Sequence, residues 1–351
     1  MSDTDPRVEL IRHWLREDLR WPLRELRSAS ADASFRRYFR IWSHDGATRI
    51  VMDAPPDKED IGPYLRVSAL LADCGVHVPV IDAADPARGL VLLEDLGNTH
   101  MLAGLQNVSD AAALYAQALQ ALAEIQLRGN EAARQLPPYD AAVLMREMQL
   151  MPEWFCARHL QLPAGAAQPP VLQQTMQFLI GEILQQPVVL VHRDYHSRNL
   201  MITAERSPGI IDFQDALAGP IGYDPVSLLK DCYIAWPRAQ VEEWVRDYHR
   251  LLQQRGAVPG ADAREFLRWF DLVGLQRHIK VLGIFARLWY RDGKNGYLGD
   301  LPRTLEYVRD TAHRYSELQA FAGWVEQTLV PALPRANQHA LAPAARAAVL
   351  S

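Results

Sequence analysis

The sequence predicts an α+β protein with two lobes, a small β-rich first lobe and a larger helical second lobe. In roughly the first 95 residues, short β-like runs flank one helical stretch in the order β-β-α-β-β. From Ser109 onward, apolar residues recur at helical spacing, and three short apolar runs interrupt them at 188–191, 199–203 and 208–212. Strands and helices that segregate in this way along a chain are typical of the α+β class.

The first lobe is expected to begin with a helix, because Asp5-Pro6 is a good N-terminal cap and apolar residues follow it at helical spacing. The expected strands of this lobe lie at 35–42, 48–53, 78–81 and 89–93. A helix that ends at Cys74-Gly75 separates the two strand pairs.

The second lobe is expected to consist mainly of helices, at 109–126, 140–159 and 171–185 and throughout the chain after Asp224. An Ala- and Pro-rich segment closes the sequence. We therefore assign residues 1–96 to the first lobe, 97–335 to the second, and 336–351 to a loosely held tail.

The composition excludes several classes of protein. Of the 351 residues, 49% are apolar and 23% charged, and the net charge of −5 argues against nucleic acid or an anionic membrane as a partner. The three widely spaced cysteines predict neither a disulfide framework nor a zinc site. Since no apolar segment is long enough for a signal or a membrane span, we expect a cytoplasmic protein. The oligomeric state stays open.

Three polar residues follow the expected buried strands at a spacing that indicates a functional site. Asp194 comes after the apolar run 188–191, Asn199 lies five residues later, and Asp212 ends the next apolar run. Phosphoryl transfer needs a group that orients the attacking hydroxyl and oxygen ligands that hold Mg²⁺ on a nucleotide. We therefore expect Asp194 to be the catalytic residue, and Asn199 and Asp212 to be metal ligands. The plainer interpretation is that all three cap turns between strands.

The same loop also permits a different metal chemistry. His192, Asp194 and His196 have a spacing that could bind a transition metal in a hydrolase, although the remaining histidines form no second cluster. Histidines that hold the loop through hydrogen bonds are the simpler explanation for both rings.

The motif His-Arg-Asp-x-x-x-x-Asn at 192–199, with Asp-Phe-Gln-Asp-Ala at 212–216 and Gly-Tyr-Asp-Pro-Val at 222–226, resembles the aminoglycoside phosphotransferase/choline kinase group. The resemblance implies a two-lobed protein-kinase-like fold that uses ATP and Mg²⁺. It implies that the catalytic loop is supported by His192, His196 and Asp224. The run Leu-Leu-Glu-Asp-Leu-Gly at 92–97 is similar to the adenine-binding segment of that group, with Glu94 and Leu96 beside the nucleotide.

Two departures from the group concern the nucleotide. The expected third strand reads Arg-Ile-Val-Met-Asp at 49–53 without the phosphate-binding Lys, and a Ser/Ala-rich run at 28–34 replaces a Gly-rich loop. We expect Ser34, Arg36 and Arg37 to contact the nucleotide. The replacement cation could come from Arg36, Arg37, Arg49 or Lys58.

Further stretches at 33–40, 51–56, 152–155 and 276–285 resemble the bacterial anomeric sugar kinases. This implies transfer of the ATP γ-phosphate to the C1 hydroxyl of N-acetylmuramate or N-acetylglucosamine in cell-wall recycling. The expected sugar-binding residues are Glu147, Trp154, Arg277 and His278, with a cation for the lactyl carboxylate of N-acetylmuramate. The alternatives are an aminoglycoside or other small-molecule phosphotransferase, and a catalytically inactive nucleotide-binding pseudokinase.

Overall fold

The computed structural model describes residues 5–31, 35–258 and 260–342. The chain divides into two compact units. Unit 1 comprises Met1–Asn107 and Arg198–Asp215, and unit 2 comprises Val108–Ser197 and Ala216–Ser351. This division differs from the expected boundary after residue 96, because the segment 198–215 leaves the helical part of the chain and joins the β-rich part.

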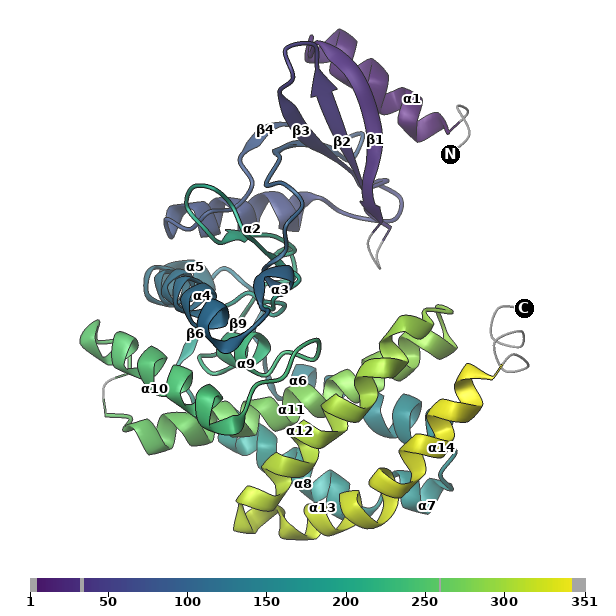
Figure 1. Ribbon diagram of the computed structural model, residues 1–351, viewed down its shortest axis with the longest axis vertical. Coiled ribbons are helices and arrows are strands. Elements are labelled where there is room, and N and C mark those ends of the chain that lie inside the picture. Colours follow the sequence, from purple (N-terminus) through teal and green to yellow (C-terminus); the bar gives the residue numbers. More distant parts are fainter. Residues whose placement is uncertain (1–4, 32–34, 259, 343–351) are drawn as a thin grey trace. The chain divides into compact units, whose positions relative to one another are not determined.

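Unit 1 contains a five-stranded antiparallel sheet (Figure 1). Its strands, in spatial order, are β1 (Leu23–Ala31), β2 (Arg37–Ser43), β3 (Thr48–Asp53), β5 (Leu90–Glu94) and β4 (Ile81–Asp85). Helix α2 (Gly62–Asp73) connects β3 to β4. The segment 198–215 adds a two-stranded ribbon of β7 (Leu200–Met201) and β8 (Gly209–Ile210).

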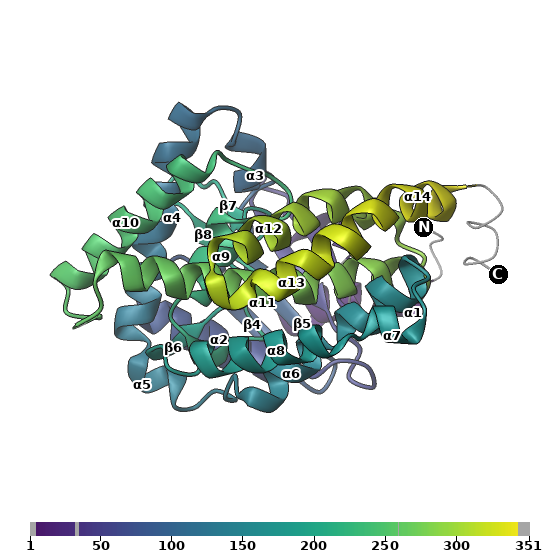
Figure 2. The same ribbon diagram turned by 90° about the horizontal axis from the view of Figure 1, so that it is seen from below.

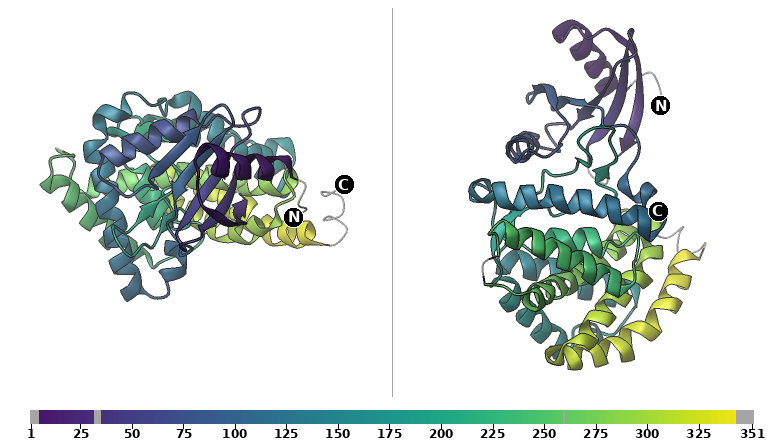
Figure 3. Two further views of the ribbon diagram at one scale, coloured as in Figure 1. Left: turned by 90° about the horizontal axis from the view of Figure 1, so that it is seen from above. Right: turned by 60° about the vertical axis from the view of Figure 1, so that its left-hand side comes forward.

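Helix α1 (Pro6–His13) covers one face of this sheet, as the left view of Figure 3 shows. Its buried side chains form a core with residues that alternate along the strands, among them Phe39 and Ile41 of β2 and Val51 of β3. Because successive side chains of a strand point to opposite faces, the residues between them face the other side of the sheet. That opposite face is available for a binding site.

Strand β1 corrects the expectation that residues 28–31 form part of a phosphate-binding loop. The chain is already extended from Leu23, and its register with β2 is irregular between Ser28 and Ser30. An edge strand pairs on one side only and carries polar residues, so it lacks the apolar alternation by which strands are recognised. The nucleotide-binding role expected for Ser34 falls outside the described residues.

Unit 2 is built from helices and one small antiparallel pair, β6 (Val188–Val191) with β9 (Leu217–Pro220). Its main helices are α4 (Val108–Arg128), α6 (Ala141–Met148), α8 (Pro170–Ile183), α9 (Tyr223–Leu229), α10 (Arg238–Gln254), α11 (Ala263–Tyr290), α12 (Leu301–Arg314), α13 (Gln319–Trp324) and α14 (Val330–Leu341). Figure 2 shows α11, α12 and α13 side by side. Residues 270–283 of α11 are buried on every side, as in the central helix of a bundle.

Two expectations for unit 2 change in detail. The helix expected at 140–159 is α6 followed by a π-helical segment, Met151–His159. The tail expected from residue 336 begins inside α14, which ends at Leu341 and buries Leu333 and Ala340. Residues 343–351 fall outside the described part of the chain. Among the described helices, none is long and apolar enough to span a membrane.

Candidate active site

Unit 1 contains a cavity of about 460 Å³ on the face of the sheet opposite α1. Strands β2, β3 and β5 contribute Tyr38, Arg40, Ile50 and Leu93, the residues that alternate with the core positions. The remaining lining residues are Ala29, Tyr64, Pro79, Glu94, Asp95, Leu96, Gly97, Asn98, His100, Arg198, Asn199, Met201, Ile211 and Asp212. The cavity therefore combines the segment 94–97 with both expected metal ligands, and its volume suits a small molecule.

Arg40 fixes the shape of the segment 94–97, and sequence reasoning did not single it out. Its guanidinium donates to both carboxylate oxygens of Asp95, at 2.7 and 2.8 Å, and to the carbonyl of Gly97 at 2.9 Å. Asp95 also accepts the backbone N–H of Gly97, which has a positive φ of 85°. The clue to Arg40 was its place in the strand, since it alternates with the apolar residues Phe39 and Ile41.

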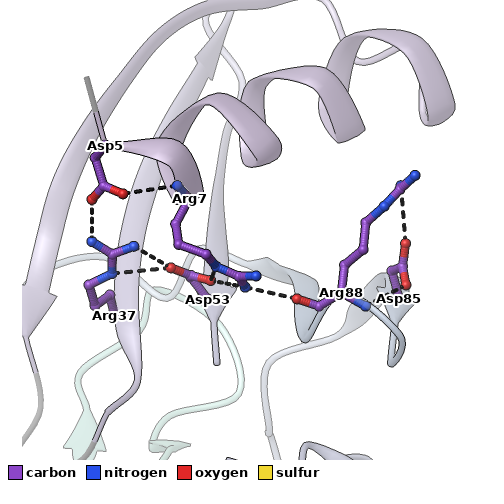
Figure 4. Close-up of polar contacts among 6 residues, drawn as sticks. All are labelled: Asp5, Arg7, Arg37, Asp53, Asp85 and Arg88. Atoms are coloured by element: carbon purple, nitrogen blue, oxygen red, sulfur yellow. Dashed lines mark hydrogen bonds and ion pairs between the residues drawn. The ribbon is translucent and has the colours of Figure 1, made fainter. Parts of the chain in front are cut away.

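Arg37 occupies the opposite face of the sheet from the cavity. Figure 4 shows it beside the buried carboxylate of Asp53, to which it donates from Nε at 3.1 Å and from Nη2 at 2.7 Å. Arg7 of α1 donates to the same carboxylate from Nε at 2.8 Å, and Asp5 accepts from Arg37 at 2.5 Å. Arg37 thus ties α1 to the sheet, and this corrects the expectation that it contacts the nucleotide.

Two other candidates for the missing Lys are also engaged elsewhere. Arg49 lies in β3 on the α1 side of the alternation, pairs with Asp82 at 2.5 Å and covers the ring of Trp21. Lys58 is exposed and lies 3.5 Å from Asp57. Of the four expected cations, Arg36 is therefore the one that approaches an expected metal ligand.

The side chains of Asn199 and Asp212 lie together in unit 1. Asn199 donates from Nδ2 to Asp212 at 3.1 Å. Gln214 donates to the other carboxylate oxygen at 2.9 Å, and Arg36, which is 8% exposed, lies 3.5 Å from that oxygen. Asp212 adopts a left-handed φ of 63°, which is uncommon outside glycine and is often found at functional sites.

Asp224 holds the start of the catalytic loop in unit 2. Its buried carboxylate accepts the backbone N–H groups of His192 at 2.7 Å and Arg193 at 2.9 Å. Arg193 has a φ of 81°, so these two bonds stabilise a strained backbone directly before Asp194. His192 is also buried, and its Nδ1 accepts the backbone N–H of Asp194 at 3.3 Å.

A second buried carboxylate, that of Asp231, holds the end of the same loop. It accepts the backbone N–H of Ser197 at 3.1 Å and the hydroxyl of Ser197 at 2.5 Å. The N–H of Tyr233 donates to its other oxygen at 3.0 Å, and the ring of Tyr233 lies against His196. Sequence reasoning missed Asp231, because no spacing links a residue 34 positions away to the loop.

The charges around Asp194 keep its carboxylate ionised. Burial raises the pKa of Asp194, but the opposing effect of His196, Lys280 and Arg277 is larger, and the pKa lies below its usual value. An ionised carboxylate can accept a hydrogen bond from a hydroxyl group and orient it.

Glu147 is buried beside the loop and binds cations of this chain. It accepts from Arg193 at 2.5 Å and lies 2.9 Å from Nζ of Lys280. The hydroxyl of Tyr139 also donates to it, as does Nε2 of Gln276 at 3.4 Å. Burial raises the pKa of Glu147, but Lys280 and Arg193 outweigh it and the pKa is lowered. These contacts position Arg193, a role different from the sugar contact expected for Glu147.

His278 lies in a different environment from that expected, and Trp154 lies beside an arginine. His278 is 0% exposed, stacks on Tyr307 and hydrogen-bonds the carbonyl of Lys230 at 3.0 Å. Since its ring does not reach a surface, the expected sugar contact is corrected to a role in the core. Trp154 is half-buried, and the guanidinium of Arg158 lies 4.6 Å from its ring centre.

The hydrolase alternative gains no support. Among the described residues, no group of three His, Cys, Asp or Glu side chains is arranged to hold a metal ion. The ring of His192 accepts the N–H of Asp194, and the ring of His196 lies against Tyr233.

Solved structures show the same fold at low sequence identity. A choline/ethanolamine kinase family protein from Mesorhizobium loti superposes with a TM-score of 0.60 at 14% identity, covering 92% of this chain and 99% of that one. An ethanolamine kinase from Plasmodium vivax gives a TM-score of 0.59 at 13% identity, covering 81% and 82%. The predicted α+β, protein-kinase-like fold is confirmed.

The chain belongs to the Phosphotransferase enzyme family, whose profile matches residues 25–270. The N-acetylmuramate/N-acetylglucosamine kinase of Pseudomonas putida is 44% identical over 328 residues, which cover 91% of this chain and 95% of that protein. The enzyme of the same name from Neisseria meningitidis is 45% identical over 313 residues, covering 88% and 92%. The family resemblance inferred from the motifs is confirmed.

Proposed function

We propose that this phosphotransferase moves the γ-phosphate of ATP to the C1 hydroxyl of N-acetylmuramate or N-acetylglucosamine. The observation that carries the proposal is the loop around Asp194, in which a strained residue held by Asp224 precedes Asp194 and nearby cations lower the pKa of its carboxyl. High identity over nearly the whole chain to kinases named for these two sugars supports the choice of acceptor.

The residues of unit 1 fit a nucleotide with Mg²⁺. The carboxylate of Asp212 and the amide oxygen of Asn199 are hard oxygen ligands, and Mg²⁺ commonly takes one or two protein oxygens together with phosphates and water. When bound, the ion would neutralise charge on the phosphates. Arg36 supplies a positive charge beside Asp212. The backbone of Glu94 and Leu96, which line the cavity, would hydrogen-bond the adenine.

In the proposed reaction, Asp194 orients the sugar hydroxyl and accepts its proton as the oxygen attacks the γ-phosphorus. The bond from phosphorus to the bridging oxygen breaks, and ADP leaves. We place this reaction in the cytoplasm, in keeping with three buried cysteines that are all free thiols.

The test is ³¹P NMR of the protein with Mg-ATP and, in parallel, N-acetylmuramate, N-acetylglucosamine or kanamycin. An anomeric phosphate signal with either amino sugar is expected. Asp194→Asn should lower the rate about 10²- to 10⁴-fold, the usual contribution of a general base. Signal with kanamycin alone would replace the proposal by an aminoglycoside phosphotransferase, and silence in every sample would favour the pseudokinase.

A further inference from the structure

Helix α11 carries two buried cations three residues apart in contrasting environments. Lys280 lies 2.9 Å from the carboxylate of Glu147, and it donates to the hydroxyl of Tyr223 at 3.0 Å. Arg277 is 5% exposed, and across the described part of the chain its one hydrogen bond goes to Sγ of Cys232 at 3.7 Å. Lys280 therefore has a carboxylate as its direct partner, whereas the direct hydrogen-bond partner of Arg277 is a thiol.

A thiol is a poor partner for a buried guanidinium. Arginine stays charged at any ordinary pH and offers five N–H donors, which match the two oxygens of a carboxylate. Burial raises the pKa of Cys232, so the thiol is neutral and supplies no counter-charge. The carboxylates of Asp194 and Asp231 act on Arg277 through charge, but among the described residues neither accepts a hydrogen bond from it, so most of its N–H donors remain for an external anion.

Arg277 lies on the part of α11 that is next to the catalytic loop. Lys280, one turn further along, binds Glu147, which in turn binds Arg193, the residue before Asp194. The charge of Arg277 also contributes to keeping Asp194 ionised. An acceptor sugar placed at Asp194 would therefore have Arg277 nearby.

We propose that Arg277 binds the carboxylate of an acidic amino sugar and so selects N-acetylmuramate over N-acetylglucosamine. N-acetylmuramate carries a lactyl carboxylate that N-acetylglucosamine lacks, and the rest of the two sugars is the same. This inference rests on the proposed function and adds the residue that distinguishes the two substrates. Of the neighbouring cations on α11, His278 is in the core and Lys280 is paired, so neither competes for this role.

The experiment compares steady-state kinetics of the wild type, Arg277→Met and Arg277→Lys with N-acetylmuramate, its methyl ester and N-acetylglucosamine. Loss of a charge-assisted contact should lower kcat/KM of Arg277→Met for N-acetylmuramate about 10- to 100-fold. Its kcat/KM for N-acetylglucosamine should fall by a smaller factor, because with that sugar only the charge that helps keep Asp194 ionised is lost, and Arg277→Lys should be intermediate. The wild type should discriminate against the ester, and Arg277→Met should not.

Arg287→Met is the matched control, since Arg287 is a half-buried cation of the same helix and should leave the ratio of the two sugars unchanged. Equal losses with both sugars would overturn the inference. If Arg277→Met fails to fold, a wild type that treats acid and ester alike would overturn it instead. Wild-type inactivity toward both sugars would refute the proposed function itself, and the inference with it.

Discussion

The charged groups of the two units are organised differently. In unit 1, the pair of Arg49 and Asp82 on the sheet has both members about one-third exposed. In unit 2, Glu147 and its partner Lys280 are both less than 10% exposed. The first arrangement shapes a cavity from strands and backbone, and the second fixes one loop in one conformation.

This difference in burial predicts which charged residues can be substituted with little loss of stability. Exposed ion pairs are screened by water and contribute little to stability, whereas removing one partner of a buried pair leaves a charge without compensation. Substitution of Glu147 should therefore cost much more than substitution of an exposed pair such as Arg49 and Asp82.

The largest effect is expected for Glu147→Gln. The substitution leaves Arg193 and Lys280 buried without their shared carboxylate, so the free energy of unfolding should fall by about 3–5 kcal/mol. Urea denaturation measures the change. Glu182→Gln, which removes a half-exposed partner of Arg268, is the control and should cost less than about 1 kcal/mol. Equal costs would show that burial does not separate the two kinds of pair.

A smaller effect is expected for Asp231→Asn, at the end of the catalytic loop. An amide cannot accept at both positions used by Ser197 and Tyr233, and the loss should be about 1.5–3 kcal/mol of stability. The kcat should fall as the loop loosens, while the KM for ATP should stay constant, since every residue of the cavity lies in unit 1. A higher KM for ATP with unchanged kcat would contradict a role in positioning the loop. Ser197→Ala, which removes one of the bonds, should fall between wild type and variant.

The candidate catalytic set could be proposed from the sequence because it is local. Asp194 and Asn199 belong to one loop, and Asp212 ends the next apolar run, so spacing carries the information. The alternation of β2 likewise places Arg37 and Arg40 on opposite faces of the sheet. Which of the two faces the cavity follows only when the position of α1 is known.

What could not be predicted depends on partners distant in the chain. Asp231 supports the loop from 34 residues away, and β1 is a polar edge strand without an apolar alternation. Arg277 and Lys280 both look like cations of one helix, yet a thiol lies beside the first and a carboxylate beside the second. Only tertiary contacts separate such residues.

A pH dependence should distinguish two buried carboxylates of unit 2. Burial raises the pKa of Asp224 to about 7, despite the two backbone N–H groups that lower it. Between the ordinary carboxyl pKa of about 4 and this value, the folded protein holds a proton that the unfolded chain has released. Relative to Asp224→Asn, wild-type stability should therefore fall by up to about 1.4 kcal/mol per pH unit as the pH rises from about 5 to 7.

Asp271 provides the matched comparison for Asp224. Burial raises its pKa too, but Lys230 and Arg238 outweigh that effect and lower the pKa to about 2. Both its folded and its unfolded forms are ionised above about pH 5, so Asp271→Asn should show no such slope relative to wild type. Unfolding curves at several pH values measure both. Parallel behaviour of the two variants would contradict the pKa assigned to Asp224.

The smallest effect is expected for Arg49→Met in unit 1. Arg49 and Asp82 are each about one-third exposed, so their separation should cost less than about 1 kcal/mol. Because Arg49 lies on the α1 side of the sheet, Arg49→Met should also leave the KM for ATP unchanged. Arg36→Met should raise the KM for ATP, because it removes the positive charge beside Asp212. ATP titration of both variants decides the point. A raised KM for Arg49→Met alone would identify Arg49 as the replacement for the missing Lys, against the strand alternation that separates the two faces of the sheet.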